Sequence, residues 1–241
     1  MTPRSFLRSS VRWSAAGVGL AAAGYAAYVG MTWAGYGHPS RARPDERDEL
    51  LDRFMPAYDV IDRYHVAVAA PAAQALAVAG EMDLSDVVVV RAVFKARELI
   101  LGAAPDTRPR PRGLLADVRS LGWVVLAERP GREIVVGAVT QPWEANVTFR
   151  SVSAERFAAF NEPDYVKIVW TLRADAIGDR VSIFRTETRA VATDASARAK
   201  FRRYWAFLSP GIILIRRMML GQVKAEAERR SQEPRLSLAR R

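Results

Sequence analysis

The chain lacks cysteine altogether and has only two histidines among its 241 residues. The absence of cysteine excludes disulfide scaffolds, thiolate zinc sites, iron–sulfur clusters and catalysis by a thiol. Two histidines are too few for a histidine-rich metal centre, and the sequence has no glycine-rich phosphate loop, so we expect neither a metal ion nor a cofactor. Glycine and proline, with 15 and 13 residues, are not in excess, and 50% of the residues are hydrophobic. A disordered or collagen-like chain is therefore excluded as well.

The net charge of +10 lies almost entirely at the C-terminal end. Residues 195–241 contain 12 basic and three acidic residues, a net charge of +9, whereas residues 58–194 contain 17 basic and 18 acidic residues. A solvated helix face with a charged tail explains this excess, and contact with anionic lipid is a second interpretation. Nucleic acid is disfavoured, because Tyr204 and Trp205, beside Arg202 and Arg203, belong to an apolar stripe and no nucleic-acid-binding motif is present.

The N-terminal segment has the features of a membrane anchor. Residues 13–36 carry no charge, and 24 residues in a helix are enough to cross a hydrocarbon core of about 30 Å. Three arginines precede this stretch and aromatic residues stand at both of its ends, as in an interfacial belt: Arg4, Arg8, Arg12, Trp13, Tyr28, Trp33 and Tyr36. We predict that residues 1–36 form a basic stub and an uncleaved single-pass transmembrane helix. A cleaved signal peptide and a soluble helix are the alternatives, although no convincing small-x-small cleavage site closes the apolar run.

The sequence barely determines on which side of the membrane the domain lies. Positive charges flank the anchor on both sides, with Arg41, Arg43, Arg47 and Arg53 after it. Acidic residues interrupt this second group, which slightly favours a cytoplasmic N-terminus and a domain outside the cytoplasm. Residues 37–57 are interpreted as a charged linker that buries no apolar surface.

The remaining pattern predicts an α+β domain over residues 58–230. Alternating apolar residues predict strands at residues 58–69, 123–128, 133–140, 146–152, 165–174 and 181–193. Helices are predicted at residues 71–80, 85–102, 114–121 and 153–160. A long amphipathic helix follows over residues 196–230, with an expected kink at Ser209-Pro210-Gly211, and residues 231–241 form a basic tail. Helices and strands do not alternate regularly, so a doubly wound parallel sheet is disfavoured.

Three segments carry a resemblance to a known superfamily. They are residues 166–172 (Val-Lys-Ile-Val-Trp-Thr-Leu), residues 186–189 (Thr-Glu-Thr-Arg) and residues 201–205 (Phe-Arg-Arg-Tyr-Trp). With the element order over roughly residues 56–230, they resemble the START-like helix-grip superfamily, also called SRPBCC or polyketide-cyclase/lipid-transport-like. The resemblance implies a curved antiparallel sheet wrapped around a long C-terminal helix, with a cavity between the two. Members mostly bind apolar ligands and some are enzymes, but they share no catalytic residue that maps onto this chain.

Five residues are candidates for ligand binding: Glu187, Arg189, Trp170, Tyr204 and Trp205. If the odd-numbered face of the strand at 181–193 lines the cavity, Glu187 and Arg189 lie inside it, and a buried guanidinium there binds a carboxylate or phosphate in bidentate fashion. A structural ion pair and an exposed cross-strand pair are the alternatives for these two residues. The three aromatic residues fit a pocket wall or ordinary core packing.

These observations favour the binding of a hydrophobic or amphipathic small molecule, such as a lipid, in a cavity under the C-terminal helix. An enzyme of the cyclase, dehydratase or hydrolase kind, with Glu187 or another cavity acid as its base, is the first alternative. The second is a membrane-tethered interaction module whose own side chains fill the cavity. Ligand binding requires an apolar cavity of roughly 300 Å³ or more.

Overall fold

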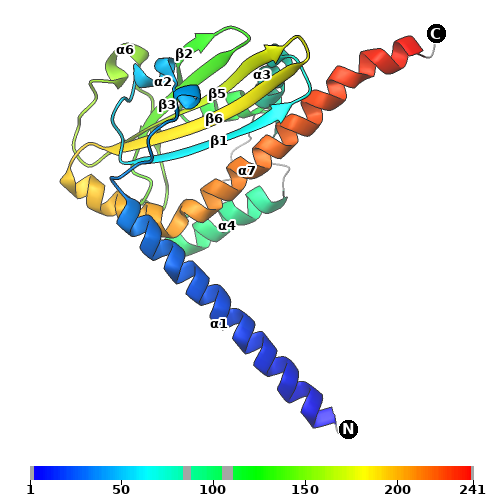
Figure 1. The fold of residues 1–241 in the computed structure, drawn as a ribbon. Coiled ribbons are helices and arrows are strands. Elements are labelled where there is room, and N and C mark those ends of the chain that lie inside the picture. The colour runs from blue at the N-terminus through cyan, green and yellow to red at the C-terminus, as the bar shows by residue number, and fades with distance from the viewer. Residues whose placement is uncertain (1–2, 84–87, 105–110, 240–241) are drawn as a thin grey trace.

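The computed structural model describes residues 3–83, 88–104 and 111–239 of the chain. A curved antiparallel sheet wraps around a long C-terminal helix, α7, and a second long helix, α1, projects away from this domain (Figure 1). The predicted α+β class and the helix-grip arrangement of sheet and helix are therefore confirmed by the architecture itself.

The sheet has six strands, and the main path runs in the order β1-β6-β5-β3-β2, with β4 paired to β3. The strands are β1 (Val60–Val68), β2 (Val124–Arg129), β3 (Glu133–Thr140), β4 (Phe149–Arg150), β5 (Val166–Gly178) and β6 (Val181–Ala192). All of the pairings are antiparallel. The turn between β2 and β3 needs a left-handed residue, which Gly131 supplies with φ +69°. All eight residues of β3 are buried, which shows that both faces of the sheet are covered at its centre.

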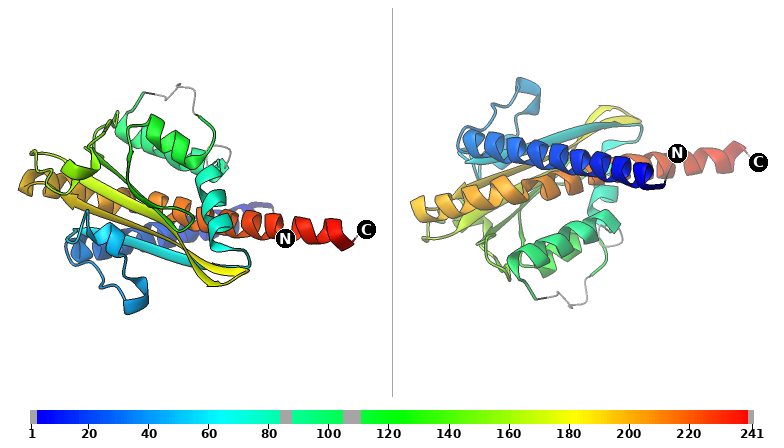
Figure 2. Two further views of the ribbon diagram at one scale, coloured as in Figure 1. Left: turned by 90° about the horizontal axis from the view of Figure 1, so that it is seen from above. Right: turned by 90° about the horizontal axis from the view of Figure 1, so that it is seen from below.

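Seven α-helices and one 3-10 turn are described. They are α1 (Pro3–Gly35), η1 (Pro44–Glu46), α2 (Glu49–Asp52), α3 (Ala72–Glu81), α4 (Val88–Leu101), α5 (Leu114–Ser120), α6 (Ala154–Phe157) and α7 (Ala195–Ala239). Viewed from above and below, α7 lies across the concave face of the sheet, while η1 and α2 lie on the opposite side of the domain from α4 (Figure 2).

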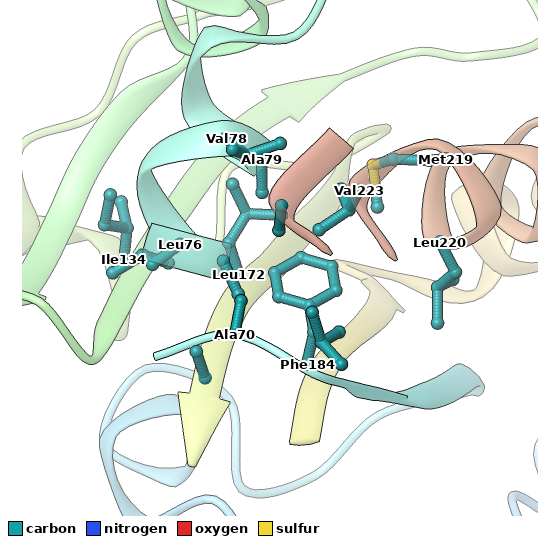
Figure 3. Packing of buried hydrophobic residues seen from close by; sticks show 14 of the residues in the cluster. Ala70, Leu76, Val78, Ala79, Ile134, Leu172, Phe184, Met219, Leu220 and Val223 are labelled. Atoms are coloured by element: carbon teal, nitrogen blue, oxygen red, sulfur yellow. The ribbon is translucent and has the colours of Figure 1, made fainter. Parts of the chain in front are cut away.

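The main core lies between the concave face of the sheet, α3 and α7. Leu172 of β5 and Phe184 of β6 meet Met219 and Val223 of α7 and Val78 of α3, and all five are buried (Figure 3). Each apolar side chain of this size contributes roughly 2 kcal/mol when it is removed from water. This cluster holds the C-terminal half of α7 against one end of the sheet.

The convex face is covered by residues that the sequence analysis assigned to a linker. Leu50, Leu51, Phe54 and Met55 are all buried and pack with Val135, Val139, Phe157 and Val169. Asp48 begins α2 by accepting a hydrogen bond from the Leu51 backbone N–H (2.9 Å). The prediction that residues 37–57 bury no apolar surface is wrong, because this segment supplies one layer of the second core.

A carboxyl pair is buried beneath this segment. Glu133 of β3 lies beside Asp48, and Thr171 Oγ1 is 3.4 Å from Glu133 Oε1. Burial, followed by the hydrogen bond with Asp48 and its charge, raises the pKa of Glu133 to about 8, although the nearby Arg173 and Arg129 act in the opposite direction. The raised pKa favours the protonated form of Glu133 at neutral pH.

The C-terminal part of α1 is attached to α7. The Tyr25 hydroxyl donates to the Phe207 carbonyl (2.7 Å), and the Tyr28 hydroxyl pairs with Ser209 Oγ (2.7 Å). One turn further on, the Arg202 guanidinium donates to the Trp33 carbonyl and lies over the Trp33 ring, 4.4 Å from its centroid. Most side chains from Gly19 to Gly35 are nevertheless exposed, including Leu20 and Met31, so α1 presents an apolar surface that nothing in the described structure covers.

Several predicted boundaries are corrected by the structure. Helix α7 is continuous through Ser209, Pro210 and Gly211, and its N-terminal part runs at an angle to the rest of the helix, in agreement with the predicted kink (Figure 1). It extends to Ala239, so the predicted basic tail begins inside the helix. The strand expected at residues 146–152 is reduced to β4. The proposed caps of α4, Ser85 and Asp86, lie outside the described residues. Within the described residues, the segment Ala195–Glu233 of α7 is long and apolar enough to cross a membrane by length and composition, with 28% of its apolar window buried.

Candidate ligand-binding cavity

An apolar cavity of about 540 Å³ lies between the concave face of the sheet and α7, and α4 and α5 close its sides. This volume lies in the range of 300–1,000 Å³ that is typical of small-molecule sites. Its wall consists mainly of aliphatic and aromatic side chains, among them Val93, Ile168, Phe149, Leu208, Ile212 and Ile215. The sequence-derived requirement for a large apolar cavity is therefore met.

The periodicities of the strands and of α7 explain why the cavity is apolar. Ile168 and Trp170 alternate along β5 and project to the concave face, while Leu208, Ile212 and Ile215 recur at helical spacing on α7.

A glycine is needed where α4 meets α7. A Cβ atom at Gly211 would lie 2.7 Å from Val93 Cγ1, so the absence of a side chain there allows the close approach.

The three predicted aromatic residues line this cavity. Trp170 meets Trp123 edge-on, with ring centroids 6.2 Å apart, and Tyr204 stacks with Phe201 at 6.1 Å. Trp205 also packs against Phe201, at 6.0 Å. Burial raises the pKa of the Tyr204 hydroxyl. The placement of the three aromatic residues fits the pocket-wall interpretation, and their contact with a ligand stays a prediction.

Glu187 and Arg189 lie on the other face of the sheet. The residues of β6 that line the cavity are the even-numbered ones, Thr186, Thr188 and Ala190. Glu187 and Arg189 are buried under α2, where they form an ion pair with Arg189 Nε 2.6 Å from Glu187 Oε1. The hypothesis that the odd-numbered face of this strand lines the cavity is wrong, and of the alternatives the structural ion pair describes the geometry.

Additional partners make this ion pair a network. Arg189 Nη1 donates to Asp52 Oδ1 (2.5 Å) and to the Met55 carbonyl (2.7 Å), and its guanidinium lies over the Tyr58 ring. Arg63 Nε donates to the second oxygen of Glu187 (2.6 Å). These contacts fasten the 50–58 segment to β1 and β6. They stabilise the convex core and leave no group directed into the cavity.

The cavity has one polar end. Arg216 of α7 lines it together with Thr186 and Thr188, and Arg216 Nη1 lies 3.3 Å from Thr186 Oγ1. Arg216 was not among the candidate residues of the sequence analysis. The signal that identifies it is the strict four-residue spacing from Tyr204 through Leu208 and Ile212, which puts position 216 on the same face of the helix.

The cavity opens to the outside near α1. Three of its large apolar lining residues have exposed side chains: Tyr25 of α1 (47% exposed), Ile100 of α4 (66%) and Phe207 of α7 (52%). We call the opening between these residues the mouth. It is formed by large apolar groups from three helices, so its rim is as apolar as its interior.

The described lining residues include no aspartate, glutamate or histidine. Their ionisable side chains are Tyr25, Arg97, Tyr204 and Arg216. General acid–base catalysis commonly uses a carboxyl group or an imidazole within hydrogen-bonding reach of the substrate. Within the described part of the chain no cluster of three potential metal ligands occurs.

No protein-family model and no curated protein matches this sequence. Solved structures with a related arrangement include a hypothetical protein, jhp0584, from Helicobacter pylori, with 6% identity, a TM-score of 0.39, and coverage of 78% of this chain and 99% of that chain. The Zhui aromatase/cyclase from Streptomyces sp. R1128 has 16% identity, a TM-score of 0.23, and coverage of 70% and 94%. The di-domain aromatase/cyclase BexL has 16% identity, a TM-score of 0.24, and coverage of 70% and 46%. These likenesses are distant, and the fold assignment rests on the sheet and α7.

Proposed function

We propose that this protein binds a hydrophobic or amphipathic small molecule, a membrane lipid or a lipid-derived compound, in the cavity between the sheet and α7. The observation that carries the proposal is the cavity itself. Its volume of about 540 Å³ and its apolar wall match the requirements of such a ligand. An interaction module with a filled cavity does not fit this geometry, and an enzyme that uses Glu187 as its base does not fit the position of Glu187 on the opposite face.

We further propose that α1 anchors the domain in a membrane and that the mouth faces the lipid. The exposed apolar side chains of α1, among them Leu20 and Met31, belong to the same helix as the rim residue Tyr25, whose hydroxyl donates to the Phe207 carbonyl. A patch of this kind on a water-soluble surface is costly, and a bilayer removes that cost. The exposed Arg203 of α7 is available for anionic headgroups, whereas other basic residues of this helix, such as Lys200, are paired with acids. The domain then lies outside the cytoplasm if the N-terminus is cytoplasmic.

Truncation tests the anchor. A chain without residues 1–24 keeps Tyr25, Tyr28 and Tyr36 and should leave the membrane fraction in folded form. A chain without residues 1–36 also loses Tyr36, which is buried against Phe201, and should unfold more easily by about 3 kcal/mol. Membrane fractionation and thermal unfolding report the two effects. Retention of the shorter truncation in the membrane would show that α1 is not what holds the protein there.

Tryptophan quenching tests the binding. Trp13 and Trp33 are replaced by Phe in the full chain, so that emission comes from tryptophans of the domain, of which Trp123, Trp170 and Trp205 line the cavity. The protein is reconstituted in phosphatidylcholine vesicles that contain dibromostearic acid or dibromostearyl alcohol. A brominated chain inside the cavity should quench the emission with saturation at low mole fraction.

A matched pair of variants identifies the cavity as the site of quenching. Ala96 of α4 is exposed at the surface and also lines the cavity, so Ala96→Phe should obstruct access without overpacking the core. Ala92, one turn earlier, is exposed but does not line the cavity, and Ala92→Phe should quench like the parent. Absence of quenching in the parent, or equal quenching in both variants, would contradict the proposed function.

A further inference from the structure

The polar end of the cavity is built around one incompletely paired guanidinium. Arg216 Nε is buried without a hydrogen-bond partner and lies 3.5 Å from Asp62 Oδ2, which also lacks one. An arginine side chain carries five N–H donors, and the hydrogen bond that the structure gives it is the one from Nη1 to Thr186 Oγ1 (3.3 Å). Burial lowers the pKa of Arg216, although the charge of Asp62 opposes this effect. A buried cation with this few partners is costly unless a further acceptor binds it.

The carboxylate of Asp62 satisfies this need only in part. It is not a lining residue, and it approaches the guanidinium at Nε, so Nη2 and the second N–H of Nη1 remain available to a ligand. Tyr64 shares the same carboxylate, because burial and then the hydrogen bond to Asp62 raise the pKa of Tyr64 to about 12. The Asp62–Arg216 pair therefore lies at the base of the polar end, and N–H donors of the Arg216 guanidinium remain for a ligand on its cavity side.

Thr188 adds a second unpaired group at the same place. It lines the cavity and is only 6% exposed, and its Oγ1 is buried without a hydrogen-bond partner. Thr188 is the direct cross-strand neighbour of Asp62, and Thr186 is the neighbour of Tyr64. Two hydroxyls and the free edge of a guanidinium thus converge on one end of an otherwise apolar space, an arrangement that favours a group rich in hydrogen-bond acceptors.

We propose that this polar end, formed by Arg216, Thr186 and Thr188, binds the carboxylate of a long-chain fatty acid, whose hydrocarbon chain extends along α7 to the mouth. The inference rests on the proposed function and names the class of ligand. A carboxylate accepts two hydrogen bonds from a guanidinium and keeps lone pairs for the threonine hydroxyls. Arg216 lies nine positions after Phe207 at the mouth, which corresponds to about 14 Å along the helix. The acid group therefore lies deep inside and the chain end lies near the membrane.

The test compares three ligands that share one hydrocarbon chain. Dibromostearic acid, its methyl ester and dibromostearyl alcohol are presented in phosphatidylcholine vesicles to the full chain with Trp13 and Trp33 replaced by Phe. Quenching of the cavity tryptophans gives the mole fraction for half-saturation. A charge-assisted contact at Arg216 should make this value at least about tenfold lower for the acid than for the ester or the alcohol.

Neighbouring arginines provide matched variants. Arg216→Gln should remove the preference for the acid while binding of the alcohol persists. Arg217→Gln should preserve the preference, because Arg217 is exposed, lies over the Tyr64 ring and does not line the cavity. Thr188→Val has nearly the same shape and should weaken binding of the acid several-fold. The comparison of the three ligands on the parent protein and on Thr188→Val does not depend on the folding of Arg216→Gln.

The outcomes separate this inference from the proposed function. Quenching by all three ligands at equal mole fractions, or an unchanged acid preference in Arg216→Gln, would overturn the carboxylate site and leave the cavity as a binder of neutral lipids. Absence of quenching by any of the three would overturn both proposals. An acid preference that disappears in Arg216→Gln and persists in Arg217→Gln would establish the site.

Discussion

Replacement of Arg189 by alanine tests the structural role that the convex-face network assigns to this residue. Arg189 is 2% exposed, and its guanidinium donates to Glu187, Asp52 and the Met55 carbonyl. Removal of one partner from a buried ion pair typically costs 3–5 kcal/mol, because the other charge is left uncompensated. We expect Arg189→Ala to lower the free energy of unfolding substantially and to leave ligand binding unchanged.

The structure places the cost at the lower end of this range. Glu187 keeps its second partner, Arg63, at 2.6 Å, and the side chain of Asp52 is 47% exposed, so water replaces that contact. The Met55 carbonyl loses its buried donor. The expected loss is therefore about 3 kcal/mol, which corresponds to a decrease of about 1 M in the urea midpoint for a slope of about 3 kcal/mol per molar.

Urea unfolding of the full chain, followed by tryptophan emission, measures this loss. The control is Arg150→Ala, which removes an ion pair with Glu162 in which both side chains are more than 40% exposed and should cost less than about 1 kcal/mol. Quenching by the brominated ligands gives the affinity in parallel. A loss for Arg189→Ala no larger than that of the control, or a weaker affinity without loss of stability, would refute this assignment.

Two further predictions concern a buried carboxyl group and two helical glycines. Since the pKa of Glu133 is raised to about 8, the folded protein holds a proton that the unfolded chain releases above about pH 4.3. The free energy of unfolding should therefore fall between these two pH values by up to about 1.4 kcal/mol per pH unit. Urea titrations at several pH values measure this slope, and Glu133→Gln should remove it. Gly221→Ala, where a Cβ meets nothing within 4 Å, should stabilise α7 by up to about 1 kcal/mol. Gly211→Ala should forfeit that gain through its collision with Val93 at 2.7 Å, and equal thermal unfolding temperatures for the two variants would contradict the predicted close approach of α4.

The spacing of apolar residues along the sequence was sufficient to predict most helices and strands of the domain. It failed to predict which face of a strand borders the cavity, because a second layer of residues covers the other face. The stripe on α7 and the strands of both hairpins follow directly from apolar spacing. On β6, apolar residues occupy both faces, since Ile183 and Val191 lie on one and Phe184 and Ala190 on the other. Such a strand gives no signal of which face borders the cavity, because both are covered.

The layer that the sequence analysis did not predict is the segment at residues 50–55. Its apolar residues stand among so many charges that it was interpreted as a linker, and its packing against the convex face was not predicted. Arg216 was overlooked for the opposite reason, because a charged residue in a basic helix is usually solvated. Only the three-dimensional position of Asp62, Thr186 and Thr188 reveals that this arginine is turned inward.

The attachment of α1 to α7 has a mechanical consequence. A domain on a flexible tether rotates freely and reaches a second membrane or a distant partner. Here Tyr25, Tyr28 and Trp33 fasten the helix to α7, and the chain that follows packs onto the back of the sheet instead of hanging loose. Under the proposed anchoring by α1, this attachment would set both the height and the angle of the mouth above the bilayer. Such a protein would exchange its ligand with the membrane in which it stands and would require a partner to carry that ligand any further.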